Sequence, residues 1–336
     1  MNITILGSGS WGTALAQVAS DNGHRVLIYG INPSEIDDIQ LHHQNRAYFP
    51  DVLLPTPIRA TSNLAEAVSD AEILVLAVPT VAVRSLCEAL RPLLTNHPWM
   101  VNVSKGFDPL TGHTMSTTIR EVLPDEQRSE IVSLIGPSHA EEVILRLHTA
   151  VTAISRDLAT AQVIQNAFAT PYFRIYTGKD EVGAEFAVAA KNVIAVAAGI
   201  VYGLGYRDNT RAALITRGLA EIVRMGVRLG GQMETFLGLT GIGDLIVTCS
   251  SFHSRNFQAG LAIGTANDAK DFLTTNTKTV EGIRTAKVLH EAAEQLGLEL
   301  PITTAVYRVL YEGMKPSETV DALMNRELTV EHPKMK

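Results

Sequence analysis

The first half of the chain alternates short apolar runs with amphipathic stretches. Six apolar runs have the length and composition of β-strands: residues 3–6, 25–29, 73–78, 100–103, 131–135 and 150–154. Between them, residues 81–94 and 114–123 carry apolar side chains at helical spacing. Strands that alternate with helices are typical of a parallel sheet covered by helices on both faces. The pattern therefore predicts an α/β, doubly wound N-terminal domain.

The second half of the chain has a helical pattern instead. Long stretches with helical periodicity cover residues 182–204, 211–229 and 282–295, and no alternating strand pattern competes with them. Eleven of the 14 prolines lie at or before Pro171, and none lies from Tyr172 to Leu300. The polar, turn-like segment 176–180 is the predicted boundary. We therefore expect two domains, an α/β domain over residues 1–180 and an all-α domain over residues 181–336.

A glycine-rich turn joins the first apolar run to the first helical pattern. Gly7, Gly9 and Gly12 form a GxGxxG motif that follows the run and precedes a helical pattern over residues 13–22. In such a turn the glycines allow the tight bend, the approach of phosphates to the backbone, and close packing of helix on strand. Free N–H groups at the helix N-terminus then meet the negative charge of a pyrophosphate. In this context the motif predicts a Rossmann-type dinucleotide-binding domain rather than a glycine-rich turn without a ligand.

Composition and charge narrow the classes of function. Hydrophobic residues make up 46% of the chain and charged residues 19%, as in ordinary soluble globular proteins. The net charge is −7 and no Lys/Arg cluster is present, which argues against binding of nucleic acids. Positive charge for an anionic ligand must therefore be concentrated in one pocket.

Cysteine and histidine patterns predict a cytoplasmic protein without a metal site. Cys87 and Cys249 lack metal-ligand spacing, and the ten histidines form no HExxH pattern. The apolar run before Gly7 is too short for the core of a signal peptide. The longest apolar tract, 186–204, contains Lys191 and is rich in alanine and glycine. We expect that tract to be a buried helix rather than a membrane span.

Two lysines occupy unusual positions for a solvated side chain. Lys105 follows the predicted strand at 100–103 and precedes Gly106, and Lys191 lies in the apolar segment FAVAAKNVIA. Burial of an ammonium group is costly, so such a lysine is usually paired or functional. The alternative is a lysine that extends its amine to solvent from a helix edge. A general acid or base would need a pKa of roughly 7–8, which a nearby cation and partial desolvation favour.

Polar residues in two glycine- or serine-containing segments of the second half are further candidates. Asp244, in the turn LTGIGDL, could cap a helix or hold a catalytic lysine through a charge-assisted hydrogen bond. The consecutive residues Ser254, Arg255 and Asn256 suit the three oxygens of a phosphate group, or else form a solvated loop.

Two further segments, each at the start of a predicted helix, could bind a ligand or only cap the helix. Gly136 and Ser138 follow the predicted strand at 131–135, where backbone N–H groups could face a ligand or Ser138 could be the N-cap. Thr279 and Glu281 open another predicted helix, and there too capping is the structural alternative.

The motifs occur in one order along the chain: GSGSWGTALA, NRAYFP, VSKGFDPLTG, GPSHAEEV, FAVAAKNVIAVAAGI, LTGIGDLIVTCSS, HSRNF and VEG. In this order the sequence resembles the bacterial NAD(P)-dependent glycerol-3-phosphate dehydrogenase family. The resemblance extends from Asn2 to about Tyr311. The two lysine motifs and the GIGDL and SRN segments are far more specific than GxGxxG.

The resemblance implies a role for each candidate residue. The residues implied to contact NADH or NADPH are Gly7, Gly9, Ser10, Trp11, Gly12, Ile31, Lys105, Ala140, Arg255, Thr279 and Glu281. Those implied to contact dihydroxyacetone phosphate or sn-glycerol 3-phosphate are Lys105, Gly136, Ser138, Lys191, Asp244, Ser254, Arg255 and Asn256. Lys191 would exchange a proton at the C2 oxygen, supported by Asp244, while Lys105 would stabilise the developing alkoxide. The implied role is the supply of glycerol 3-phosphate for phospholipid synthesis by a homodimer that does not insert into a membrane.

The end of the second predicted strand leaves the choice of cofactor open. NAD-preferring folds usually place Asp or Glu there, and members of this family often have Arg or His. This chain has Ile31, which supplies neither charge, and Asn32, which could bind either ribose form. A slight preference for NADPH through Arg46 or Arg255 is the expectation.

Two alternatives remain, one another dehydrogenase and one from a different functional class. A β-hydroxyacid or 6-phosphogluconate-type dehydrogenase shares the domain plan and a catalytic lysine, but recognises a carboxylate. A dinucleotide-binding redox sensor without turnover would leave Lys191, Asp244 and the Ser254 segment without a function.

Overall fold

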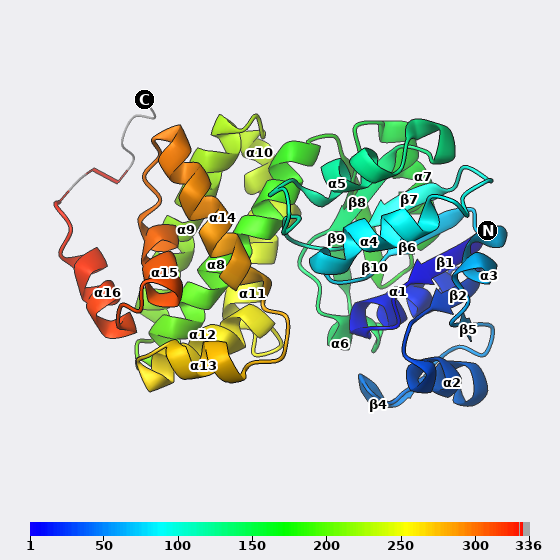
Figure 1. Ribbon diagram of the computed structural model, residues 1–336, viewed down its shortest axis with the longest axis horizontal. Helices are drawn as coiled ribbons and strands as arrows, with labels where there is room; N and C mark the ends of the chain where they lie inside the picture. The colour runs from blue at the N-terminus through cyan, green and yellow to red at the C-terminus, as the bar shows by residue number, and fades with distance from the viewer. Residues whose placement is uncertain (329, 332–336) are drawn as a thin grey trace. The chain divides into compact units, whose positions relative to one another are not determined.

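The computed structural model describes residues 1–328, 330 and 331. Within it the chain forms two compact units, Met1–Glu181 and the remainder from Val182 onward (Figure 1). The first unit is built on a sheet, and the described part of the second is helical.

The first unit contains an eight-stranded sheet. In spatial order its strands are β10 (Phe173–Gly178), β9 (Thr149–Ile154), β8 (Ile131–Ile135), β7 (Trp99–Asn102), β6 (Ile73–Leu76), β1 (Asn2–Leu6), β2 (Arg25–Tyr29) and β5 (Arg59–Thr61). From β5 to β8 all neighbours are parallel. A separate antiparallel pair is formed by β3 (Gln44–Asn45) and β4 (Phe49–Leu53).

One edge of the sheet differs from the sequence prediction. The expectation of a purely parallel sheet is wrong there, because β9 runs antiparallel to β8, and β10 is parallel to β9. The segment 176–180 is not a turn, since β10 continues to Gly178 and pairs Tyr176 with Thr152. Its polar residues are those of an edge strand, in which alternate side chains face solvent.

Helices cover both faces of the sheet, as the doubly wound prediction requires (Figure 1). One face carries α1 (Ser10–Asp21), α2 (Pro33–His42), α6 (Ala140–Val143) and α7 (Leu158–Phe168). The other carries α3 (Leu64–Ser69), α4 (Thr80–Leu90) and α5 (Met115–Val122). Side chains alternate between these layers along a strand: Ile73 and Val75 pack on the α1 side, and Leu74 on the α4 side. Burial on both faces explains why the central strands are continuously apolar.

The second unit is built around one long buried helix. Its helices are α8 (Glu181–Gly203, whose first residue belongs to the first unit), α9 (Asp208–Arg228), α10 (Met233–Phe236), α11 (Asp244–Ser250), α12 (Arg255–Ala266), α13 (Lys270–Thr275), α14 (Glu281–Leu296), α15 (Pro301–Tyr311) and α16 (Pro316–Met324). The apolar stretch of α8 is long enough to cross a membrane, but all of that stretch is buried inside the protein. The helix therefore serves as a core helix, as its alanine and glycine content predicted.

Glycines bring α8 and α12 into very close contact. A Cβ atom placed on Gly199 would lie 2.1 Å from the Phe257 carbonyl oxygen, and one on Gly264 would lie 2.2 Å from that of Ile200. Any larger side chain at these positions would collide with the backbone of the opposite helix. This glycine seam fixes the distance between the helix that carries Lys191 and the helix that begins at Arg255.

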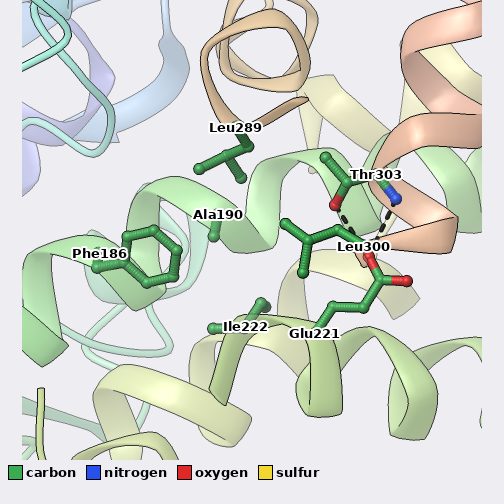
Figure 2. A pocket seen from close by; sticks show the side chains of 7 residues that line it. All are labelled: Phe186, Ala190, Glu221, Ile222, Leu289, Leu300 and Thr303. Atoms are coloured by element: carbon green, nitrogen blue, oxygen red, sulfur yellow. Dashed lines mark hydrogen bonds between the residues drawn. The ribbon is translucent and has the colours of Figure 1, made fainter. Parts of the chain in front are cut away.

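A buried carboxylate lies beside a small cavity in the helical unit (Figure 2). The cavity measures about 10 Å³ and is lined by Phe186, Ala190, Glu221, Ile222, Leu289, Leu300 and Thr303. The Glu221 carboxylate accepts hydrogen bonds from the backbone N–H groups of Ile302 (2.6 Å) and Thr303 (3.1 Å), and from Thr303 Oγ1 (3.0 Å). Glu221 therefore caps the N-terminus of α15 from the neighbouring helix α9.

Candidate active site

The glycine-rich turn between β1 and α1 fits the pyrophosphate of a dinucleotide. Gly7 has φ of +131°, and a Cβ on Gly12 would lie 2.1 Å from the Gly7 carbonyl oxygen. By contrast, a Cβ on Gly9 would meet no atom within 4 Å, so open space lies beside the loop. Helix α1 starts at Ser10 and has no acidic residue in its first turn, which leaves its N-terminal N–H groups and dipole available to an anion.

Neighbouring side chains hold this loop in place. Asn45 donates hydrogen bonds from Nδ2 to the Ser8 carbonyl oxygen and to Thr13 Oγ1, both at 2.8 Å. The indole Nε1 of Trp11 is buried without a hydrogen-bond partner among the described residues, and so remains a donor for a ligand. Asn45 lies in the NRAYFP motif but was not among the residues predicted for the site.

Ala140 lies in a helix that packs on the helix following this loop. It is the first residue of α6, which packs against α1. Gln17 of α1 donates a hydrogen bond from Nε2 to the Ile144 carbonyl oxygen at 2.8 Å, just beyond the end of α6. Ala140 and residues 10–12 of the glycine-rich turn therefore belong to two helices that pack on each other in the first unit.

Lys105, Gly136 and Ser138 come together at the carboxyl ends of β7 and β8. Lys105 Nζ donates to the Gly136 carbonyl oxygen at 2.9 Å, and Ser138 Oγ donates to the same oxygen at 3.1 Å. Gly136 has φ of +154°, and a Cβ there would lie 2.9 Å from Val151 Cα. The alternative role of Ser138 as an N-cap is wrong, because His139 occupies that position in α6.

The loop after Lys105 is anchored by a buried carboxylate. Asp108 accepts hydrogen bonds from Arg84 Nε at 2.8 Å and from the Leu110 backbone N–H at 3.0 Å. Burial alone would raise the pKa of Asp108, but these hydrogen bonds and the Arg84 charge outweigh it and hold the pKa below its usual value. The ionised Asp108 thereby fixes the segment that carries Lys105.

In the second unit, Lys191 is buried against a carboxylate and a hydroxyl. Its Nζ lies 2.6 Å from Asp244 Oδ1 and donates to Thr248 Oγ1 at 2.8 Å. Lys191 is 4% exposed and Asp244 1%. The interpretation of Lys191 as a lysine that reaches solvent is therefore wrong. The interpretation of Asp244 as a helix cap is also wrong, because Gly243 is the N-cap of α11. A short π-helical turn, Leu239–Gly243, leads directly into Asp244, and such turns are frequent at functional sites.

A second polar contact ties three helices together beside Lys191. Asn256 donates from Nδ2 to Asn192 Oδ1 at 3.0 Å, and its own Oδ1 accepts from the Gly282 backbone N–H at 2.8 Å. A Cβ on Gly282 would lie 2.5 Å from the Asn192 carbonyl oxygen. The start of α14, where Glu281 lies, and the start of α12 are thereby held next to the residue that follows Lys191.

The remaining predicted residues lie at these two helix starts. Ser254 is the N-cap of α12, where its Oγ accepts from the Phe257 N–H at 3.2 Å. Arg255 is exposed and makes no ion pair among the described residues, so its charge is available to an anion. Thr279 is half-buried and does not cap α14, because Val280 is the N-cap and makes no side-chain hydrogen bond.

Thr248 and Asn192 were missed by the sequence analysis. Each had a weak local signal: Thr248 follows Asp244 by four residues, which puts both on one helix face, and Asn192 is adjacent to Lys191. The contacts themselves join residues more than 50 positions apart, since 57 separate Lys191 from Thr248 and 64 separate Asn192 from Asn256.

Fold and site together define a class of enzyme. A Rossmann-type sheet with a phosphate-binding turn, and a helical unit with a buried lysine–carboxylate pair, are the parts of a nicotinamide-dinucleotide-dependent dehydrogenase. Among the described residues, no group of three or more His, Cys, Asp or Glu side chains is arranged to hold a metal ion.

Comparison with known proteins gives the family. Residues 2–161 match the family described as NAD-dependent glycerol-3-phosphate dehydrogenase N-terminus, and residues 180–321 match its C-terminus. The chain therefore belongs to the NAD-dependent glycerol-3-phosphate dehydrogenase family.

Individual relatives agree over nearly the full length. The chain is 48% identical over 330 residues to glycerol-3-phosphate dehydrogenase [NAD(P)+] of Streptococcus thermophilus, covering 98% of this chain and 97% of that protein. It is 47% identical over 334 residues to the Lysinibacillus sphaericus protein of the same name, covering 99% of each. The crystal structure of glycerol-3-phosphate dehydrogenase from Coxiella burnetii aligns with a TM-score of 0.90 at 32% identity, covering 97% of this chain and 99% of that one.

Proposed function

We propose that this protein interconverts dihydroxyacetone phosphate and sn-glycerol 3-phosphate with NADH or NADPH, and so supplies glycerol 3-phosphate for phospholipid synthesis. The observation that carries the proposal is the buried contact of Lys191 with Asp244 and Thr248. A buried ammonium paired with a carboxylate is a suitable proton donor for a carbonyl oxygen that becomes an alcohol.

The reaction requires a hydride and a proton at one carbonyl group. When bound, the reduced nicotinamide supplies the hydride to C2. In our proposal Lys191 Nζ gives a proton to the C2 oxygen and takes it back in the oxidising direction. Asp244 holds the amine in one orientation. Thr248 Oγ1 accepts from the amine at 2.8 Å and is itself fixed by its bond to the Asp244 backbone carbonyl oxygen at 2.6 Å.

Other residues would bind and orient the substrate and the cofactor. We assign Arg255, Ser254 and Asn256 to the phosphate end, because the exposed Arg255 guanidinium stands at the N-terminus of α12. Lys105, Gly136 and Ser138 would contact the substrate in the first unit. On this basis residues 1–180 are the dinucleotide-binding domain, and residues 181–336 carry the catalytic lysine.

The direct test is the loss of absorbance of NADH or NADPH in the presence of dihydroxyacetone phosphate. Substrate-dependent oxidation supports the proposal. Oxidation with 3-hydroxyacid or keto-acid substrates alone would replace it with a β-hydroxyacid dehydrogenase, and cofactor binding without any turnover would indicate a sensor.

The Lys191→Ala variant tests the assigned mechanism. We expect kcat to fall by about 10²–10⁴, because general acid–base catalysis contributes about that factor, while cofactor binding is retained. Lys287→Ala, which removes an exposed lysine of the same unit, is the matched control. A Lys191→Ala enzyme with near wild-type kcat would remove this lysine from the mechanism.

Assembly and location complete the proposal. We infer a homodimer from the resemblance to bacterial enzymes of this family, and light scattering on the purified protein measures its mass directly. A cytoplasmic location is supported by two free, buried cysteines and by the burial of the apolar helix α8.

A further inference from the structure

A carboxylate reaches the end of β2, where the sequence showed only the uncharged Ile31. Ile31 is 86% exposed. Glu35, in the first turn of α2, instead extends to the glycine-rich loop, where its Oε2 accepts a hydrogen bond from Ser8 Oγ at 2.5 Å. Its Oε1 accepts from Asn32 Nδ2 at 2.9 Å. The charge is therefore fixed beside the second residue of the GxGxxG motif.

The local backbone is built for this contact. Gly30 allows the end of β2 to approach the loop, because a Cβ there would lie 2.4 Å from Ser8 Oγ. Asn32 is the N-cap of α2 and accepts a hydrogen bond from the Ser34 N–H at 3.2 Å, with Pro33 at the first helical position. Asn32 thus both starts the helix and orients the Glu35 carboxylate.

The surroundings of Glu35 are acidic. Glu35 lines a pocket of about 430 Å³ together with Asp37, Asp38 and Arg46. Arg46 donates its backbone N–H and its guanidinium Nε to Asp38, both at 2.8 Å. The guanidinium charge is therefore already compensated, and two further carboxylates remain in the same pocket.

We propose that Glu35 makes this protein select NADH over NADPH. The inference rests on the proposed function, since it concerns the cofactor of that reaction. In Rossmann-type domains a carboxylate at the end of the second strand hydrogen-bonds the adenosine ribose 2′-hydroxyl. The same carboxylate would repel the 2′-phosphate of NADPH, as like charges do at a binding site. The expected slight preference for NADPH through Arg46 is therefore reversed.

The experiment measures binding of NADH and of NADPH separately by isothermal titration calorimetry, without substrate. We expect the wild-type protein to bind NADH at least about tenfold more tightly, the size of a like-charge penalty of about 1.4 kcal/mol. Glu35→Gln keeps the size of the side chain and removes its charge, so the ratio of the two dissociation constants should fall at least about threefold. Asp37→Asn is the matched control, because it removes the same charge from the same pocket without a contact to Ser8.

Several results would overturn the inference. Tighter binding of NADPH by the wild-type protein would do so, and loss of that binding in Arg46→Ala would identify Arg46 as the selecting residue. Equal effects of Glu35→Gln and Asp37→Asn would show that the overall charge of the pocket, not Glu35, sets the ratio. Binding of neither dinucleotide would overturn the proposed function as well, whereas binding of both with a ratio near one would overturn only the selectivity.

Discussion

Lys191 can remain charged in the protein interior because two groups compensate it. An isolated buried ammonium would be very unfavourable, but Asp244 supplies the opposite charge and Thr248 an acceptor oxygen. Removal of one partner from such a pair typically costs about 3–5 kcal/mol, because the other charge is left without compensation. The contact therefore contributes to the stability of the helical unit, besides the proton transfer that we propose for Lys191.

At the residue scale, we predict that binding of the substrate depends on Arg255. Its guanidinium is exposed and unpaired among the described residues, so Arg255→Ala should leave the fold intact and remove one charged contact to phosphate. We expect KM for dihydroxyacetone phosphate to rise by about tenfold or more, and kcat to fall by less, because a charge-assisted hydrogen bond contributes about 1.5–3 kcal/mol. Steady-state kinetics check this expectation, with Arg228→Ala as a control at a distant helix end.

One result would contradict this prediction for Arg255. Unchanged KM values for both substrate and cofactor would show that Arg255 is an ordinary surface residue.

At the scale of single residues, the sequence predicted charges better than the contacts between them. Lys191 stands out because burial of a cation in an apolar helix is unfavourable unless it is paired or functional. Asp244 stands out because it is a carboxylate in a glycine-rich turn. The hydroxyl of Thr248 and the amide of Asn192 did not stand out, because neutral polar side chains are common and their partners come from distant helices. Glu35 was overlooked because it lies in a helix rather than at the strand end.

At the scale of elements, the central strands were predictable and the sheet edges were not. Strands buried on both faces must be apolar throughout, so β1, β6 and β8 are visible in the sequence. An edge strand such as β5 is three residues long, and its pairing depends on the neighbouring strand β2. The direction of β9 is likewise set by the chain path from β8 and not by its own composition.

The glycine seam between α8 and α12 gives a prediction about packing. Gly264→Ala would place a Cβ 2.2 Å from the Ile200 carbonyl oxygen, so the two backbones must move apart. We expect a loss of about 1–3 kcal/mol in the free energy of unfolding, as for other overpacked cores. Urea unfolding measures it, and Thr265→Ala, at the next and exposed position of α12, serves as the control.

A gain of about 1 kcal/mol, the amount that helix propensity alone would give, would contradict the close packing. Alanine is a better helix former than glycine by about 1 kcal/mol, so the measured loss is smaller than the packing cost by about that amount. The Thr265→Ala control shows the effect of an alanine introduced at an exposed position, where no backbone opposes it.

For the molecule as a whole, Glu221 makes stability depend on pH. Burial raises the pKa of this carboxyl group to about 7, although the N–H groups of Ile302 and Thr303 act in the opposite direction. The folded protein therefore holds a proton that the unfolded chain releases near its ordinary pKa of 4.5. The stabilising contribution is complete below about pH 4.5 and is lost as the pH rises through about 7.

The Glu221→Gln variant isolates this effect. Glutamine stays neutral, so the variant should gain stability relative to the wild-type protein between about pH 5 and pH 8, by at most about 3 kcal/mol. Thermal unfolding of both proteins at the two pH values measures the difference. A difference that does not change with pH would show that Glu221 does not titrate in this range.

The burial of both cysteines has a practical consequence. Desolvation raises the pKa of Cys87 and of Cys249 to about 12, so at neutral pH both are thiols that neither solvent nor a second protein molecule can reach. Cys249 follows Thr248 directly in the sequence, yet it offers oxidants no thiolate beside Lys191. The folded protein should therefore keep its activity in air without added reductant, and loss of activity during storage would be a sign that the helical unit has opened.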